Sequence, residues 1–171
     1  MLNIVRKTQK ITESKRGGAR LILAVALAML ASSCSDEARV WEQSQTVNNC
    51  EWRVDEALIF TMPVNDTLTW FDLLFDLRSR DDYPYSNLYL FVTTEAPNGA
   101  FSVDTVQYEL FDESGGRKGG GGSISRFAEI RVPFRTKIRF PVKGNYMVKI
   151  KHGMRDDLLK GVASLGLRLE K

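Results

Sequence analysis

Residues 137–151, KIRFPVKGNYMVKIK, decide the fold class of this chain. Apolar residues stand at 138, 140 and 142, separated by basic residues or proline, and the same period of two returns in 146–151. Such alternation is typical of a β-strand with one buried face. Lys143-Gly144-Asn145, between the two runs, has the composition of a tight turn. The stretch therefore predicts two strands that are joined by a short turn.

The same signals recur along the chain from residue 51 onward. Further strands are predicted at 52–62, 68–77, 88–94, 103–111 and 165–169. Residues 68–77 (LTWFDLLFDL) are apolar on both faces, which is typical of a central strand covered on both sides. Short turns rich in Asn, Asp, Gly and Pro separate the strands, and no long helical period interrupts them. About eight short strands at this spacing predict an all-β domain, a single antiparallel β-sandwich that is jelly-roll-like.

The first 33 residues have the composition of a secretory signal peptide. Residues 1–20 carry six basic residues against one acid, and residues 21–31 contain no polar residue. The apolar run is much shorter than the roughly 20 residues that a membrane-spanning helix needs, and small residues precede Cys34. The predicted organisation is a cleaved signal peptide at 1–33, an acylated cysteine with a polar tether at 34–50, and the β-sandwich domain at 51–171.

Leu30-Ala31-Ser32-Ser33-Cys34 resembles a bacterial lipobox. The resemblance implies that Cys34 receives a diacylglyceryl thioether, and that its new α-amino group is acylated with a fatty acid such as palmitate. Several acyl chains, at roughly 0.8 kcal/mol per buried CH₂, anchor a protein almost permanently. The expected location is the bacterial cell envelope, with the outer membrane favoured. Ser35-Asp36-Glu37 resembles the acidic export tag of Bacteroidetes surface lipoproteins, and the periplasmic and surface-facing sides both stay open.

Removal of the signal peptide changes the charge balance of the chain. It takes away six of the 24 basic residues and one of the 21 acidic residues, so the formal charge changes from +3 to −2. The basic character of the full chain is thus a property of its signal peptide. No electrostatic argument for binding nucleic acid remains.

Three local features have simple structural interpretations. Residues 35–49 are polar and predict a tether. Cys50 has no intrachain partner once Cys34 is acylated, so it is interpreted as an inert thiol beside Trp52, the alternative being a disulfide with a partner protein. Residues 115–122 (GGRKGGGG) lack the Gly-Lys-Ser/Thr of a P-loop and predict a mobile hairpin tip.

An ordered set of short motifs resembles the gliding-motility lipoprotein family GldH of Bacteroidetes. The set includes Tyr83-Pro84-Tyr85-Ser86-Asn87-Leu88-Tyr89-Leu90, Gly144-Asn145-Tyr146, Met154-Arg155, Leu158, Gly161 and Gly166. The resemblance covers nearly the whole mature chain. It implies a non-enzymatic envelope lipoprotein without cofactors, in some members alongside type IX secretion components. One departure is at Arg117-Lys118, since the family usually places a Trp among the glycines of that loop.

The residues offer little for catalysis or for metal binding. His152 is the only histidine and lies in a Lys-His-Gly sequence, so it is interpreted as a structural turn residue. Nothing like Gly-x-Ser-x-Gly flanks a serine. One histidine and one free cysteine do not supply a usual zinc site. We therefore expect no catalytic residues, no metal and no cofactor.

Two clusters are candidates for binding a partner. Arg131, Arg135, Lys137 and Arg139 are spaced by two or four residues, so a regular strand sets them on one face, with Phe134, Ile138, Phe140 and Val142 inward. Two prolines on the basic face suggest an edge strand, and Lys149 and Lys151 extend the patch if the strands form a hairpin. Tyr83 and Tyr85 form an aromatic cluster that is either a packed corner or a sugar-stacking platform.

The function predicted from these features is non-enzymatic binding of other envelope proteins by a membrane-tethered sandwich, in gliding-motility or type IX secretion-associated machinery. The alternative is a carbohydrate-binding surface lipoprotein of a glycan-uptake system.

Overall fold

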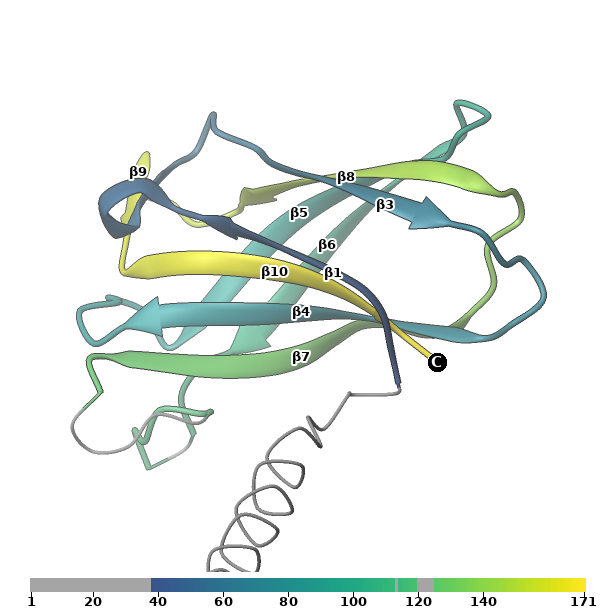
Figure 1. The fold of residues 1–171 in the computed structure, drawn as a ribbon. Coiled ribbons are helices and arrows are strands. Elements are labelled where there is room, and N and C mark those ends of the chain that lie inside the picture. The colour runs from purple at the N-terminus through teal and green to yellow at the C-terminus, as the bar shows by residue number, and fades with distance from the viewer. Residues whose placement is uncertain (1–37, 113, 120–124) are drawn as a thin grey trace, which may run out of the picture. The chain divides into compact units, whose positions relative to one another are not determined.

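The structure is a computed structural model and describes residues 38–112, 114–119 and 125–171. The predicted signal peptide and Cys34 lie outside these residues. The described part contains ten strands and one short 3₁₀ turn (Figure 1). Their bounds are β1 (Arg39–Thr46), η1 (Asn48–Cys50), β2 (Glu51–Arg53), β3 (Leu58–Val64), β4 (Phe71–Arg80), β5 (Asn87–Glu95), β6 (Phe101–Glu109), β7 (Phe127–Ile138), β8 (Gly144–His152), β9 (Leu158–Lys160) and β10 (Val162–Glu170). No helix in this part of the chain is long and apolar enough to cross a membrane.

Eight of the strands form two four-stranded antiparallel sheets that pack face to face. The strand order is β1-β10-β4-β7 in the first, called sheet I, and β3-β8-β5-β6 in the second, called sheet II. The chain changes sheets repeatedly as it proceeds, which is the jelly-roll arrangement. The short strands β2 and β9 pair separately. The predicted antiparallel β-sandwich is confirmed.

The core between the sheets follows from strict alternation along the strands. In β3 every second residue is buried, and in β4 the residues from Phe71 to Ser79 alternate in the same way. The two inner faces therefore share one apolar layer. Its largest fully buried side chains include Trp52, Phe60 and Phe75. Such a layer, rather than any local propensity, holds the sheets together.

Side chains close both open edges of the sandwich. On one side, Gln43 Oε1 of β1 accepts a hydrogen bond of 3.2 Å from the Thr61 backbone N–H, and Gln45 donates to the Ile59 carbonyl. On the other side, the Tyr108 hydroxyl of β6 donates to the Pro133 carbonyl of β7 at 3.0 Å. These bonds satisfy backbone groups that edge strands leave unpaired.

The predicted tether is wrong for residues 39–46. These residues form β1, an edge strand that pairs with β10 from Arg39 to Thr46. The polar composition of these residues suggested a tether because an edge strand buries few side chains. Only Trp41, Gln43 and Gln45 point inward, and the side-chain amides of both glutamines form hydrogen bonds. The domain therefore begins much closer to Cys34 than predicted.

Three strand predictions also need correction. The single strand predicted at 52–62 is divided into β2 and β3 by residues 54–57. The alternating run at 137–142 is not a strand of its own, because β7 ends at Ile138 and residues 139–143 form the turn into β8. The long strand β7 was not predicted in full. The strand placed at 68–77 begins only at Phe71, and its second face carries the partly buried side chains of Asp72, Leu74 and Asp76 rather than a second apolar layer.

The glycine-rich segment is ordered where the structure describes it. Asp112 Oδ1 accepts backbone N–H bonds from Ser114 and Gly116, each between 2.8 and 2.9 Å. The Arg117 guanidinium donates at 2.8 Å to the carbonyl oxygens of both Ser79 and Arg80, at the end of β4. The predicted mobile tip is therefore wrong for residues 115–119. Arg117 therefore serves a contact within the chain.

Candidate functional site

The predicted basic stripe on β7 does not lie on one face. A β-bulge shifts the register between Leu73 and Leu74, so Arg131 and Arg135 project differently. Arg131 Nε donates to Asp76 Oδ1 at 2.6 Å, on the outer face of sheet I. Arg135 instead reaches across to Asp104 on β6 of sheet II, with 2.6 Å between Nη2 and Oδ2. The predicted single-face arrangement is wrong because this bulge interrupts the regular alternation of β7.

The rest of the stripe lies at the end of β7. Lys137 has a positive φ of 51°, and its backbone N–H donates to Asp72 Oδ1 at 2.7 Å. The Arg139 guanidinium lies over the Trp70 ring, 4.0 Å from its centroid. The predicted hairpin of β7 with β8 is also wrong, since these strands belong to different sheets and Lys149 and Lys151 therefore lie on sheet II. Edge position for β7 is confirmed.

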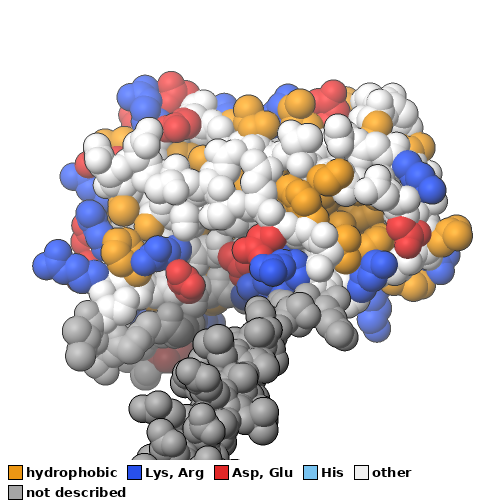
Figure 2. Space-filling model, viewed as in Figure 1, with side chains coloured by type: hydrophobic (Ala, Val, Ile, Leu, Met, Phe, Trp, Pro, Cys, Tyr) orange, Lys and Arg blue, Asp and Glu red, His pale blue; other side chains and the backbone are white. Residues whose placement is uncertain are grey.

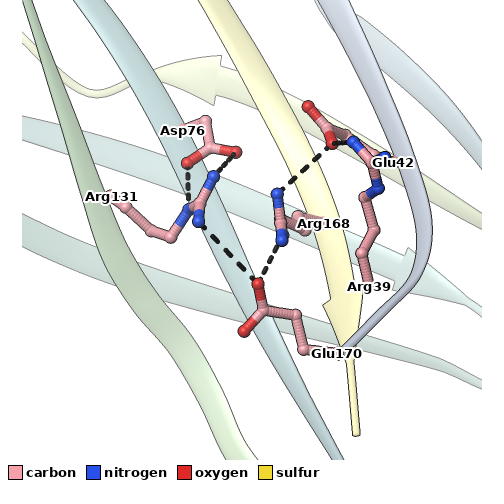
Figure 3. A network of polar contacts seen from close by, with 6 residues as sticks. All are labelled: Arg39, Glu42, Asp76, Arg131, Arg168 and Glu170. Carbon is pink, nitrogen blue, oxygen red and sulfur yellow. Dashed lines mark hydrogen bonds and ion pairs between the residues drawn. The ribbon is translucent and has the colours of Figure 1, made fainter. Parts of the chain in front are cut away.

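Alternating charges cover the outer face of sheet I. Figure 3 shows three arginines and three carboxylates in one connected network of Arg39, Glu42, Arg168, Glu170, Arg131 and Asp76. Arg168 is the least exposed member, with only 5% of its side chain accessible, and it contacts both Glu42 and Glu170. The six formal charges cancel. Figure 2 shows the result, in which acidic and basic side chains lie next to one another on this face.

A hollow of about 440 Å³ lies beside this network. Small residues of the sheet, Ser44, Ser164 and Gly166, stand among charged neighbours that include Arg78 and Glu129. Arg78 and Glu129 pair with each other at 3.4 Å. Both signs of charge therefore surround the hollow, and it offers no excess of positive charge to an anionic ligand.

The tyrosine cluster is divided between core and surface. Tyr83 is buried, with 5% of its surface exposed, and its hydroxyl donates to the Asn87 carbonyl at 2.7 Å. Burial raises the pKa of Tyr83. Tyr85 packs edge-on against Tyr83, with 6.1 Å between ring centroids. A buried ring presents no face for a sugar, so the geometry of Tyr83 is that of a packed corner.

His152 is the last residue of β8 and not a turn residue. It is fully buried and packs edge-on against Trp52, with ring centroids 5.5 Å apart. Neither ring nitrogen has a hydrogen-bond partner among the described residues. Burial lowers the pKa of His152. In the described part of the chain, no three His, Cys, Asp or Glu side chains are grouped so that they could hold a metal ion.

The outer face of sheet II carries exposed apolar side chains that were not predicted from the sequence. Its exposed apolar side chains are Tyr89 and Phe91 of β5, Phe101 and Val103 of β6, Met147 of β8 and Ile59 of β3. Polar residues stand between them, since Val103 pairs with Thr93 and Phe101 pairs with Glu95. These six side chains, here called the sheet II apolar face, are between 37% and 74% exposed. A signal was present in the sequence, because residues 88–92 (LYLFV) are apolar at both odd and even positions.

The fold and these surfaces define a jelly-roll domain whose main exposed features are the outer faces of its two sheets. Residues 39–169 match the GldH lipoprotein family, and the chain belongs to that family. It is 31% identical to the gliding motility lipoprotein GldH of Flavobacterium johnsoniae over 151 residues, covering 84% of this chain and 91% of the relative. The GldH homolog of Christiangramia forsetii is 30% identical, with coverage of 84% and 90%. The resemblance described from the sequence is confirmed, and the chain is a lipoprotein of the cell envelope.

Similarity to solved structures is much lower. The superposition on a GH115 4-O-methyl-α-glucuronidase covers 81% of this chain and 18% of the enzyme's chain, with 15% sequence identity and a TM-score of 0.42. The superposition on a family 11 carbohydrate-binding module from Clostridium thermocellum covers 76% of this chain and 82% of the module, with 11% sequence identity and a TM-score of 0.32. Scores below 0.5 carry no functional argument for this chain.

Proposed function

We propose that this chain is a non-enzymatic lipoprotein, acylated at Cys34, that binds another envelope protein of the motility or type IX secretion-associated machinery through the sheet II apolar face. The outer membrane is its proposed location. The observation that supports the binding surface is the exposure of six large apolar side chains on one sheet face, including Phe101 at 74% and Val103 at 64%. Large apolar side chains that are exposed together on one sheet face mark interaction sites on soluble domains, and here Thr93, Glu95 and Lys149 stand between them.

The composition of the face favours a protein partner. Aromatic rings and Met are enriched at the centres of protein interfaces, and Tyr89, Phe91, Phe101 and Met147 are all present here. Lys149 and Lys151 cross the same face, and Lys149 lies 3.7 Å from Glu95. The partner that fits is therefore a protein surface with an apolar centre and carboxylates opposite the two lysines.

Site-specific cross-linking in cells tests this proposal. A photo-reactive phenylalanine at position 91 or 103 of the full-length lipoprotein is expected to yield discrete protein adducts. The matched control is the same amino acid at Val54, which is 40% exposed but follows β2, away from this face. Equal adduct patterns from all three positions, or none from 91 and 103, would overturn the proposed surface.

The lipid anchor has its own test. A Cys34→Ser variant is expected to lose incorporation of an alkyne fatty acid and to leave the membrane fraction. A Cys50→Ser variant should keep both properties, because Cys50 is a half-buried residue of η1. Label that persists on Cys34→Ser would contradict acylation at this position.

A further inference from the structure

One end of the sandwich collects the start of β1, the end of β10 and the β3–β4 loop. Arg39 pairs with Glu170, and the Lys171 backbone N–H donates to the Ala38 carbonyl at 2.9 Å. Val40 and Lys171 line one hollow together with the loop residues Asn65 and Asp66. The turn from β7 to β8 is at the same end, since Gly144 pairs with Val64. This group of segments is called the β1 end.

The β1 end presents two apolar side chains on an ordered loop. Leu68 is 80% exposed and Trp70 is 55% exposed. Asp66 Oδ1 accepts the backbone N–H of Leu68 at 2.8 Å and that of Thr69 at 3.2 Å, which fixes the loop. A hydrogen bond from the Thr69 hydroxyl, with those two amides, lowers the pKa of Asp66 to about 2, so the carboxylate that holds the loop stays ionised. The hydrogen bonds of Asp66 therefore hold the loop in a conformation that exposes Leu68 and Trp70.

Basic side chains surround this loop. The Arg139 guanidinium lies over the Trp70 ring, 4.0 Å from its centroid. Lys137 precedes Arg139 in the chain and Lys143 follows it, and both lysines are exposed. None of these three has a carboxylate within ion-pair distance among the described residues. Asp66 and Asp72 also lie here, but both carboxylates accept backbone N–H groups. In Figure 2, hydrophobic and basic side chains gather at the right-hand end of the molecule.

The length of chain before β1 limits how far this end can be from a lipid anchor. Five residues lead from Cys34 to Arg39, and a fully extended chain of that length spans at most about 18 Å. Strand β4, with ten residues, is about 33 Å long. An anchor at Cys34 therefore keeps the β1 end near the membrane, at a distance smaller than the length of the domain.

We infer that the β1 end is a membrane-contact surface, with Leu68 and Trp70 entering the bilayer interface and Lys137, Arg139 and Lys143 over anionic headgroups. This inference rests on the proposed acylation of Cys34. Trp favours the membrane–water interface because its ring is amphipathic. Cations near an anionic surface are attracted to its headgroups. The contact fixes the orientation of the domain and leaves sheet II accessible to a protein partner.

Quenching of tryptophan fluorescence by brominated lipids tests the inference. The full-length, acylated protein is reconstituted into phosphatidylglycerol–phosphatidylethanolamine vesicles with or without brominated acyl chains. We expect quenching in the wild-type protein that falls by more than half in Trp70→Phe, because Trp52 is buried in the core. Trp41→Phe, at a half-buried position on the inward side of β1, is the matched control and should keep the quenching.

Charge is tested in the same assay. The triple variant Lys137→Gln, Arg139→Gln, Lys143→Gln should weaken the quenching, as should phosphatidylcholine vesicles or added salt. Quenching that is absent in the wild-type protein, or unchanged in Trp70→Phe, would overturn the inference. Acylation is verified by mass before reconstitution, so failure of the Cys34 anchor is recognised separately from failure of the contact.

Discussion

His152 gives the domain a pH-dependent stability whose direction follows from the structure. It is the only histidine of the chain and is fully buried, without a hydrogen-bond partner for either ring nitrogen among the described residues. Burial lowers its pKa from the usual value near 6.5. Below that pH the unfolded chain binds a proton that the folded domain does not, so the stability that is complete above pH 6.5 is lost as the pH falls.

The pH dependence of the free energy of unfolding is that of one proton, which the unfolded chain binds and the folded domain does not. Such a difference gives a slope of at most about 1.4 kcal/mol per pH unit, so moving from pH 6.5 to pH 5 costs up to about 1.6 kcal/mol. Carboxyl groups add little in this window: Asp66, with a pKa of about 2, and Asp112, whose pKa is also lowered by hydrogen bonds, titrate at more acidic pH. The slope between pH 5 and 6.5 therefore belongs to His152.

Urea unfolding of the domain without its signal peptide, followed by tryptophan fluorescence at pH 7.5, 6.5, 5.5 and 5.0 as test conditions, measures this slope. The His152→Leu variant has no titrating group at this position, so its free energy of unfolding should be nearly constant over the same range. If the wild-type domain is equally stable at pH 7.5 and 5.0, or if the variant keeps the wild-type slope, the assignment to His152 is refuted.

Five further substitutions at four positions test individual contacts by the same unfolding measurement. Gly161→Ala should cost at least about 2 kcal/mol, because Gly161 has φ +85° and an added Cβ would lie 2.6 Å from Tyr83 Cα; a neutral result would contradict the close approach. Tyr83→Phe should lower the free energy of unfolding by about 1 kcal/mol, because the hydroxyl hydrogen bond is lost. Tyr83→Ala should lower it by about 3–5 kcal/mol. Tyr89→Ala, on the exposed face, should change it by no more than about 0.5 kcal/mol. Arg117→Ala should cost about 1–3 kcal/mol, because two carbonyls at the end of β4 lose their donor, and no loss would mean that the loop is free.

Much of the fold was predictable because one buried face imposes a period of two on each strand. Residues 146–151 and 165–169 alternate cleanly and lie within β8 and β10. Strand β1 was not predicted, since its inward Gln43 and Gln45 use amides where a core strand uses apolar side chains. Its burial depends on the neighbouring edge of β3, which lies 14 to 18 residues later in the chain.

The candidate surfaces were less predictable because they depend on pairing between distant segments. The cations of β7 were identified, but Arg131 meets Asp76 and Arg135 meets Asp104 across 55 and 31 residues of sequence. A period of two gave no information on the β-bulge that separates them. The sheet II apolar face arises from strands β3, β5, β6 and β8 together, so no single strand sequence defines it.

The pairing of the first long strand with the last has a consequence for how the domain matures. Strand β1 has one neighbour in sheet I, β10, and β10 in turn stands between β1 and β4. Sheet I therefore remains split until residues 162–170 are available, and most of its stabilising contacts join segments far apart in sequence. Such topologies fold slowly. We therefore expect the domain to become compact only after its last strand, β10, is free to pair with β1 and β4.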